Sequence, residues 1–161
     1  MAIEVGLTQG MVALIDEADF NLVSRFNWFA FNGSTSKTYY AKTNVMRADG
    51  SRATILMHRL ILGLTDPRVH TDHIDGNGLN NQRANLRTCS NTENMRNRGA
   101  YANNKSGFKG VSFHKQSGRW RAYIKLTGKQ KHLGYFPTPE AAYAAYCAAA
   151  AELHGEFANF G

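Results

Sequence analysis

The segment from position 72 to position 94 holds a carboxylate, an imidazole and two side-chain amides, from Asp72, His73, Asn85 and Asn94. Carboxylate and amide oxygens are ligands that Mg²⁺ and similar hard cations prefer, and histidine is a base poised near neutral pH. Phosphodiester hydrolysis needs an activated water and neutralisation of the charge on the phosphate. These residue types therefore supply the parts of a one-metal nuclease site, with the histidine accepting a proton from water.

The spacing of these residues sets a condition on the backbone. Asp72 and His73 are neighbours, and neighbouring side chains on a strand point to opposite faces. They can serve one site only where the strand ends or bends, and Asp75-Gly76-Asn77-Gly78 predicts a turn just beyond them. The run Ser90-Asn91-Thr92-Glu93 is typical of a helix start, so Asn94 is expected on that helix.

The charge of the chain favours an anionic partner. Its 19 Lys and Arg against 12 Asp and Glu give a net charge of +7, and the sequence pI is about 9.6. From Lys105 to His132 there is no acidic residue, and the alternation of apolar and polar residues predicts strands rather than a membrane-surface helix. A nucleic acid is therefore the expected partner rather than a membrane surface, and the nuclease chemistry of segment 72–94 narrows the expectation to double-stranded DNA.

Secretion, membrane insertion and a structural zinc site are not expected. The sequence has no apolar run long enough for a transmembrane helix, and its N-terminus lacks the basic-then-apolar pattern of a signal peptide. Its two cysteines, Cys89 and Cys147, are too few for a four-cysteine zinc site or a disulfide framework. We therefore expect an intracellular, cytoplasmic protein.

The first 66 residues predict a small mixed sheet. Apolar stretches at 11–15, 27–31, 39–46 and 52–57 are typical of strands. Asp49-Gly50, between the last two stretches, is a strong hairpin signal. Residues 57–63 predict a short helix that ends at a glycine.

The C-terminal part predicts a three-stranded antiparallel sheet packed on one helix. Strands are expected at 109–114, 119–126 and 130–134, separated by Ser117-Gly118 and Thr127-Gly128. Thr138-Pro139-Glu140 then opens a helix that runs to His154. The whole chain is thus α+β. We expect a nuclease domain at 1–98 (β-rich at 1–66, the motif at 67–98), a linker at 99–107 and a DNA-binding domain at 108–161.

The central motif resembles the HNH endonucleases, in particular the homing-endonuclease-like branch with a ββα-metal site. The resemblance rests on the run from Val69 to Asn77 and on Asn80-Asn81, Asn85-Leu86-Arg87 and Glu93-Asn94. It implies that Asp72 and Asn94 bind the metal, that His73 is the general base, and that Asn85 ties down the loop between the two strands. Because Asn94 stands where many members have histidine, the resemblance favours Mg²⁺, with Mn²⁺ as the alternative, over zinc.

Some neighbours of the motif leave alternatives open. His58 is expected to pack or to form hydrogen bonds, and Arg59 could contact DNA. His70 is favoured as a strand or surface histidine over a phosphate contact, and Asp75 as a turn residue over a third metal ligand. Four arginines without close acidic partners in sequence are expected to contact phosphates: Arg83, Arg87, Arg96 and Arg98.

The chain from Ser106 onwards resembles the plant ethylene-response-factor (APETALA-type) DNA-binding domain. The resemblance rests on Gly107-Phe108-Lys109-Gly110-Val111, Gly118-Arg119-Trp120, Leu133-Gly134-Tyr135-Phe136, Thr138-Pro139-Glu140-Ala141-Ala142 and Leu153-His154-Gly155. It implies that the sheet enters the major groove and that the contacts are Lys109, Ser112, His114, Arg119, Arg121, Tyr123, Lys125, Gln130 and His132. The plant domain usually has Arg and Trp at several of these places, so base specificity does not carry over from it.

The leading hypothesis is a metal-dependent, site-selective DNA endonuclease of a phage or bacterial mobile element, in which the sheet locates a site and the motif cuts it. The alternatives are a non-catalytic DNA-binding protein on an HNH scaffold and an RNA-binding or RNA-processing module. A monomer with one site is expected to nick one strand. A double-strand break would require a dimer or a second event.

Overall fold

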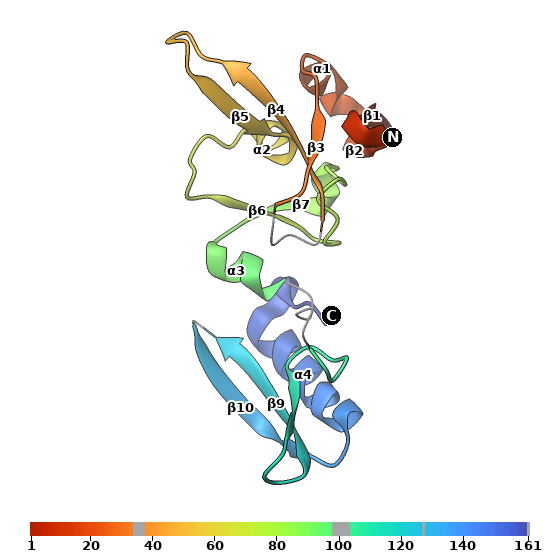
Figure 1. Ribbon diagram of the computed structural model, residues 1–161, viewed down its shortest axis with the longest axis vertical. Helices are drawn as coiled ribbons and strands as arrows, with labels where there is room; N and C mark the ends of the chain where they lie inside the picture. Colours follow the sequence, from red (N-terminus) through yellow and green to blue (C-terminus); the bar gives the residue numbers. More distant parts are fainter. Residues whose placement is uncertain (34–37, 98–103, 127, 161) are drawn as a thin grey trace. The chain divides into compact units, whose positions relative to one another are not determined.

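The computed structural model describes residues 1–33, 38–97, 104–126 and 128–160. They form two compact units, Met1–Ser90 and Asn91–Gly161. Strands and helices in both units confirm the α+β class (Figure 1). No helix in the described ranges is long and apolar enough to cross a membrane. The expected domain boundaries, with a linker at 99–107, stay a prediction.

The N-terminal strands of the first unit are all antiparallel. β1 pairs with β2, and β3, β4 and β5 form a second sheet in that order. Among the described residues these are two sheets, a finer division than the single small mixed sheet that we expected. The elements are β1 (Ala2–Gly6), η1 (Thr8–Gly10), β2 (Val12–Asp16), η2 (Glu17–Asp19), α1 (Phe20–Val23), β3 (Phe29–Phe31), β4 (Tyr40–Met46), β5 (Arg52–Leu56) and α2 (Met57–Ile61).

The hairpin at Asp49-Gly50 forms as predicted. Asp49 Oδ1 accepts hydrogen bonds from the backbone N–H and the hydroxyl of Ser51, at 2.8 and 2.6 Å. Gly50 has a φ of 80°, a left-handed conformation that glycine adopts without strain. The turn thereby sets the register in which β4 and β5 pair.

The motif forms a second hairpin within the same unit. β6 (His70–His73) pairs with β7 (Leu86–Cys89), which follows the short helix η3 (Arg83–Asn85). β6 ends at His73, where a turn closes through a hydrogen bond of 2.9 Å from Gly76 N–H to the His73 carbonyl. The strand therefore ends directly after Asp72 and His73, as the sequence predicted.

Strand β2 holds the motif against the core of the first unit. Its side chains Ala13 and Ile15 are fully buried, whereas the backbone of Leu14 faces the loop between β6 and β7. Leu14 N–H donates to the Leu79 carbonyl at 2.9 Å, and Asn81 N–H donates to the Leu14 carbonyl at 2.7 Å. The loop is thus bonded to a strand that is itself anchored in the core.

The second unit contains the predicted meander and its helix. It comprises α3 (Asn91–Arg96), β8 (Val111–His114), β9 (Arg119–Leu126), β10 (Lys129–Phe136), α4 (Pro139–His154) and η4 (Gly155–Phe157), and the sheet has the order β10-β9-β8. Ala122 and Ile124 of β9 are buried beneath α4. Thr138 caps α4 by accepting a hydrogen bond of 3.2 Å from Ala141 N–H. Thr127, in the expected second turn, lies outside the described residues.

Candidate functional site

The carboxylate of Asp72 faces Arg87 across the β6–β7 hairpin, where the two residues are directly opposite. The guanidinium donates to Asp72 Oδ2 from Nε at 2.8 Å and from Nη2 at 2.6 Å. Asp72 is only 4% exposed, and a buried carboxylate is tolerated when a charged donor compensates it. Arg87 therefore neutralises the one carboxylate among the expected metal ligands. Its predicted phosphate contact stays a prediction.

The imidazole of His73 lies in a cluster of three rings, with Tyr40 of β4 and His58 of α2. The ring centroid of His73 is 5.0 Å from that of His58 and 5.7 Å from that of Tyr40. Burial lowers the pKa of His73, and the side chain of Asn81 and nearby carboxylates oppose this effect only in part. The imidazole is therefore largely neutral at pH 7, the state that a general base requires.

His58 is a neutral packing partner in this cluster. Burial, with the charges of His73 and Arg59 adding to it, lowers the pKa of His58 to about 3. Arg59 donates to the Val69 carbonyl at 2.6 Å and to the Asp66 carbonyl at 2.7 Å. The Arg59 guanidinium thus holds the segment that leads into β6, and a contact of Arg59 with DNA stays untested.

The loop beyond His73 is organised by Asn85 and Asp75. Asn85 Oδ1 accepts from the Asp75 N–H at 3.0 Å, and its amide donates to Asp75 Oδ1 at 3.0 Å and to the Asn80 carbonyl at 2.8 Å. Burial tends to raise the pKa of Asp75, but hydrogen bonds from Asn80, Asn77 and Asn85 outweigh it and lower the pKa. Asp75 is a turn residue here, and Asn85 makes the hydrogen bonds that hold the loop.

Gly78 brings this loop into direct contact with β4. A Cβ at position 78 would collide with the Tyr39 carbonyl and the ring of Tyr40. Gly78 N–H also donates to Thr38 Oγ1 at 2.9 Å. The close approach needs a residue without a side chain, and it places the loop against the ring that also contacts His73.

Arg83 has an intramolecular partner that the sequence did not indicate. Its guanidinium binds Asp19 through bonds of 2.9 and 2.7 Å and donates to the Ile61 carbonyl at 2.8 Å. Asp19 lies 64 residues away in the chain, so no local pattern could reveal the pair. Arg83 thereby joins η3 to α2, and its predicted phosphate contact is untested.

Asn94 lies on α3, at an intermediate exposure, and Arg96 is at the end of the same helix. Both belong to the second unit, and Arg98 lies outside the described residues. The described part of the chain has no group of three His, Cys, Asp or Glu side chains suited to a metal. The two predicted metal ligands, Asp72 and Asn94, offer one carboxylate and one amide oxygen, donors that suit Mg²⁺ or Mn²⁺ better than zinc, and metal binding by them stays a prediction.

The outer face of the β8–β10 sheet carries most of the predicted DNA contacts. Ser112 lies opposite Arg121, and Tyr123 lies between Arg121 and Lys125 on β9. Arg121 donates to Ser112 Oγ at 3.4 Å, and its guanidinium carbon lies 5.3 Å from the Tyr123 ring centroid. The register also places four further predicted contacts on these strands: His114, Arg119, Gln130 and His132.

Tyr135 is a member of this face that the sequence analysis missed. Its ring centroid lies 5.0 Å from that of His114 and 4.7 Å from that of His132. His132 and Tyr135 are three residues apart, so a regular strand would place them on opposite faces. A register shift between His132 and Gly134 turns them to the same side.

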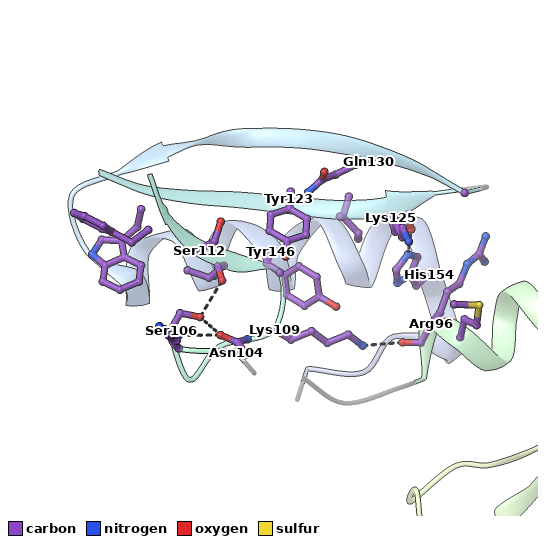
Figure 2. Close-up of a pocket in the computed structure, with 18 of the residues that line it drawn as sticks. Arg96, Asn104, Ser106, Lys109, Ser112, Tyr123, Lys125, Gln130, Tyr146 and His154 are labelled. Carbon is purple, nitrogen blue, oxygen red and sulfur yellow. Dashed lines mark hydrogen bonds between the residues drawn. The ribbon is translucent and has the colours of Figure 1, made fainter. Parts of the chain in front are cut away.

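Lys109 differs from the other predicted contacts. Its ammonium donates to the carbonyls of Arg96 at 2.8 Å and Asn159 at 3.0 Å. Burial lowers the pKa of Lys109 to about 8. Its side chain points towards Arg96, within the second unit (Figure 2).

Comparisons with known proteins found an AP2 domain in the C-terminal part of the chain and relatives among viral proteins. The model of the AP2 domain matches residues 106–156. Protein 3.8 of Escherichia phage T7 is 38% identical over 91 residues, which are 56% of this chain and 74% of that protein. A protein of Acanthamoeba polyphaga mimivirus, named as an uncharacterized HNH endonuclease, is 27% identical over 96% of this chain and 76% of its own length.

The C-terminal part also matches plant proteins. An AP2-like ethylene-responsive transcription factor of Arabidopsis thaliana is 44% identical over 50 residues, 31% of this chain and 10% of that protein. No solved structure matches the chain significantly.

Proposed function

The chain belongs to the family of phage T7 protein 3.8 and is an HNH-like protein with a C-terminal AP2 DNA-binding domain. From this we propose that it is a metal-dependent, site-selective DNA endonuclease. The observation that carries the proposal is the pair at the end of β6. Asp72 and His73 are both buried there, and the imidazole is largely neutral at pH 7. A charged oxygen ligand beside a neutral base is what hydrolysis of a phosphodiester requires.

In this mechanism His73 accepts the proton of the attacking water. The rings of Tyr40 and His58 hold the imidazole, and the loop bonded by Asn85 supports the end of β6. Asp72 and Asn94 would hold Mg²⁺ or Mn²⁺, which supplies neutralisation of the phosphate charge and help for the leaving oxygen. Arg87 orients the Asp72 carboxylate through Oδ2.

The AP2 sheet selects where the cut is made. Its outer face offers basic and aromatic side chains without a carboxylate among the predicted contacts, so it complements the phosphate backbone of a duplex. One catalytic histidine in each chain favours a nick by a monomer. Relatives in a phage and a giant virus favour action inside an infected cell.

The decisive experiment is incubation of the full chain with supercoiled plasmid and Mg²⁺, comparing the wild-type protein with His73→Asn. We expect nicked circles from the wild type and a loss of at least about 10²-fold in rate from the variant. Duplex binding, measured by gel shift, should be equal for the two proteins and serves as the control for folding. Equal cleavage by His73→Asn would reject the mechanism.

A second candidate function is a non-catalytic DNA-binding protein, and the contact between Arg87 and Asp72 favours it. A guanidinium on the carboxylate reduces the attraction of that carboxylate for a cation. This function predicts sequence-selective duplex binding with no cleavage in Mg²⁺ or Mn²⁺. The plasmid experiment therefore separates the two functions.

A further inference from the structure

Lys109 joins three segments of the second unit. Its ammonium donates to the carbonyl of Arg96, at the end of α3, and to the carbonyl of Asn159, after η4. Lys109 itself lies just before β8 of the sheet. Figure 2 shows the side chain running beneath Tyr146 towards Arg96, with its bond to the Arg96 carbonyl dashed. One half-buried cation thus connects the sheet, α3 and the C-terminal segment.

Further contacts surround this ammonium. Asn159 Nδ2 donates to Asn97 Oδ1 at 3.2 Å, and the Tyr146 hydroxyl donates to the Asn159 carbonyl at 3.3 Å. The ammonium lies 6.0 Å from the Tyr146 ring centroid. Asn97, directly after α3, is 8% exposed. The end of α3 is therefore held by a partly buried network of side chains from the AP2 domain and the C-terminal segment.

The helix needs such support. α3 has six residues, and an isolated helix of this length is not stable in water, because nucleation costs more than so few hydrogen bonds return. A cation at its C-terminal carbonyl also interacts favourably with the helix dipole. Hydrogen bonds from a charged donor are stronger than those between neutral groups. Lys109 is the charged donor in the network around this helix end.

We propose that Lys109 is a positioning residue, which fixes the helix carrying Asn94 to the DNA-binding sheet. This inference rests on the proposed function, in which Asn94 is a metal ligand. Its consequence is that the AP2 domain does more than bind DNA: it also determines how α3 presents Asn94. Disruption of the anchor should therefore impair cleavage more than it impairs DNA binding.

The test compares Lys109→Met with Lys131→Met in the full chain. Both variants lose one positive charge and keep most of the aliphatic stem, but Lys131 is an exposed residue of β10 outside the predicted contacts. Amide hydrogen exchange is measured at α3 and at the middle of α4. We expect Lys109→Met to increase exchange at α3 on the order of tenfold, with α4 unchanged, and Lys131→Met to leave both helices as in the wild type.

Equal protection of the α3 amides from hydrogen exchange in the wild type and in Lys109→Met would show that Lys109 does not anchor α3. If Lys109→Met does not fold, Asn159→Ala, which removes the hydrogen bond to Asn97, is used with the same readout and the same criterion. In the plasmid assay, run at protein concentrations that saturate the DNA so that a difference in affinity does not enter, the nicking rate of Lys109→Met should fall further below wild type than that of Lys131→Met. Equal nicking rates would reject the role in positioning Asn94. A wild-type protein that does not cut would reject the proposed function, whereas hydrogen exchange would still decide whether Lys109 anchors α3.

Discussion

Asp72 and Arg87 stand directly opposite each other on β6 and β7, and the guanidinium donates two hydrogen bonds to Asp72 Oδ2. The side chains are 5% and 12% exposed, so solvent screens the pair little. The contact joins an expected metal ligand to a cation, and it therefore affects both the stability of the hairpin and the affinity for a metal.

Replacement of Arg87 by Met should separate these two effects. The variant leaves the Asp72 carboxylate buried without the guanidinium, which is expected to cost about 3 kcal/mol of unfolding free energy. Loss of the positive charge should also tighten Mn²⁺ binding on the order of tenfold. Urea unfolding measures the first effect, and titration followed by Mn²⁺ electron paramagnetic resonance measures the second.

The matched control is Arg68→Met, because Arg68 pairs with Asp66 through exposed side chains, 88% and 41% accessible. It should change neither stability nor Mn²⁺ affinity measurably. Unchanged Mn²⁺ affinity in Arg87→Met would show that the guanidinium does not compete with a cation at Asp72.

The first unit should lose stability in acid because of His58. Its pKa is about 3 in the folded chain and near 6.5 when unfolded, so between these values only the unfolded state binds the proton. Stability is therefore present above pH 6.5 and falls as the pH drops towards 3, by up to about 1.4 kcal/mol per pH unit. Urea unfolding from pH 7 to pH 4, followed by the fluorescence of the buried Trp28 in a Trp120→Phe background, measures this slope.

His58→Phe is the comparison for this prediction. The variant lacks the titrating imidazole but keeps a ring against His73, so its slope should be shallower. Identical slopes in the two proteins would assign the acid sensitivity to other groups.

Gly78→Ala should disturb the site through Tyr40. The added Cβ would overlap the Tyr39 carbonyl and the Tyr40 ring, so the loop or the ring must move. We expect a loss of about 1–3 kcal/mol in stability, as for other overpacked positions, together with slower plasmid nicking. Gly6→Ala is the control, since a Cβ at Gly6 meets nothing within 4 Å. Wild-type nicking by Gly78→Ala would mean that the position of the Tyr40 ring does not matter for the base.

Tyr135→Ala should weaken duplex binding, because its ring packs between two predicted contacts, His114 and His132. A loss on the order of tenfold in affinity is expected, with the salt dependence nearly unchanged because no charge is removed. Fluorescence anisotropy at several salt concentrations measures both quantities. Phe31→Ala, which removes a comparably exposed aromatic side chain in the first unit, is the control, and an equal effect from it would remove Tyr135 from the DNA-binding face.

Much of the fold could be predicted from local patterns. The hairpin at Asp49-Gly50, the end of β6 at His73, and the capped helix α4 each depend on a few adjacent residues. β1 was missed, and the division into two N-terminal sheets was not foreseen. Both features depend on which strands pair with each other, and packing of side chains in the hydrophobic core determines this pairing.

The sequence by itself determined which chemical groups this protein has and where many of its strands and helices begin, because periodicity, turns and caps act over a few residues. Only the tertiary structure decided which groups meet. It paired Asp72 with Arg87, brought the rings of Tyr40 and His58 to His73, and directed Lys109 to α3. These contacts join residues that are not neighbours in sequence. They form because the interior must be closely packed and because each buried polar group needs a hydrogen-bond partner.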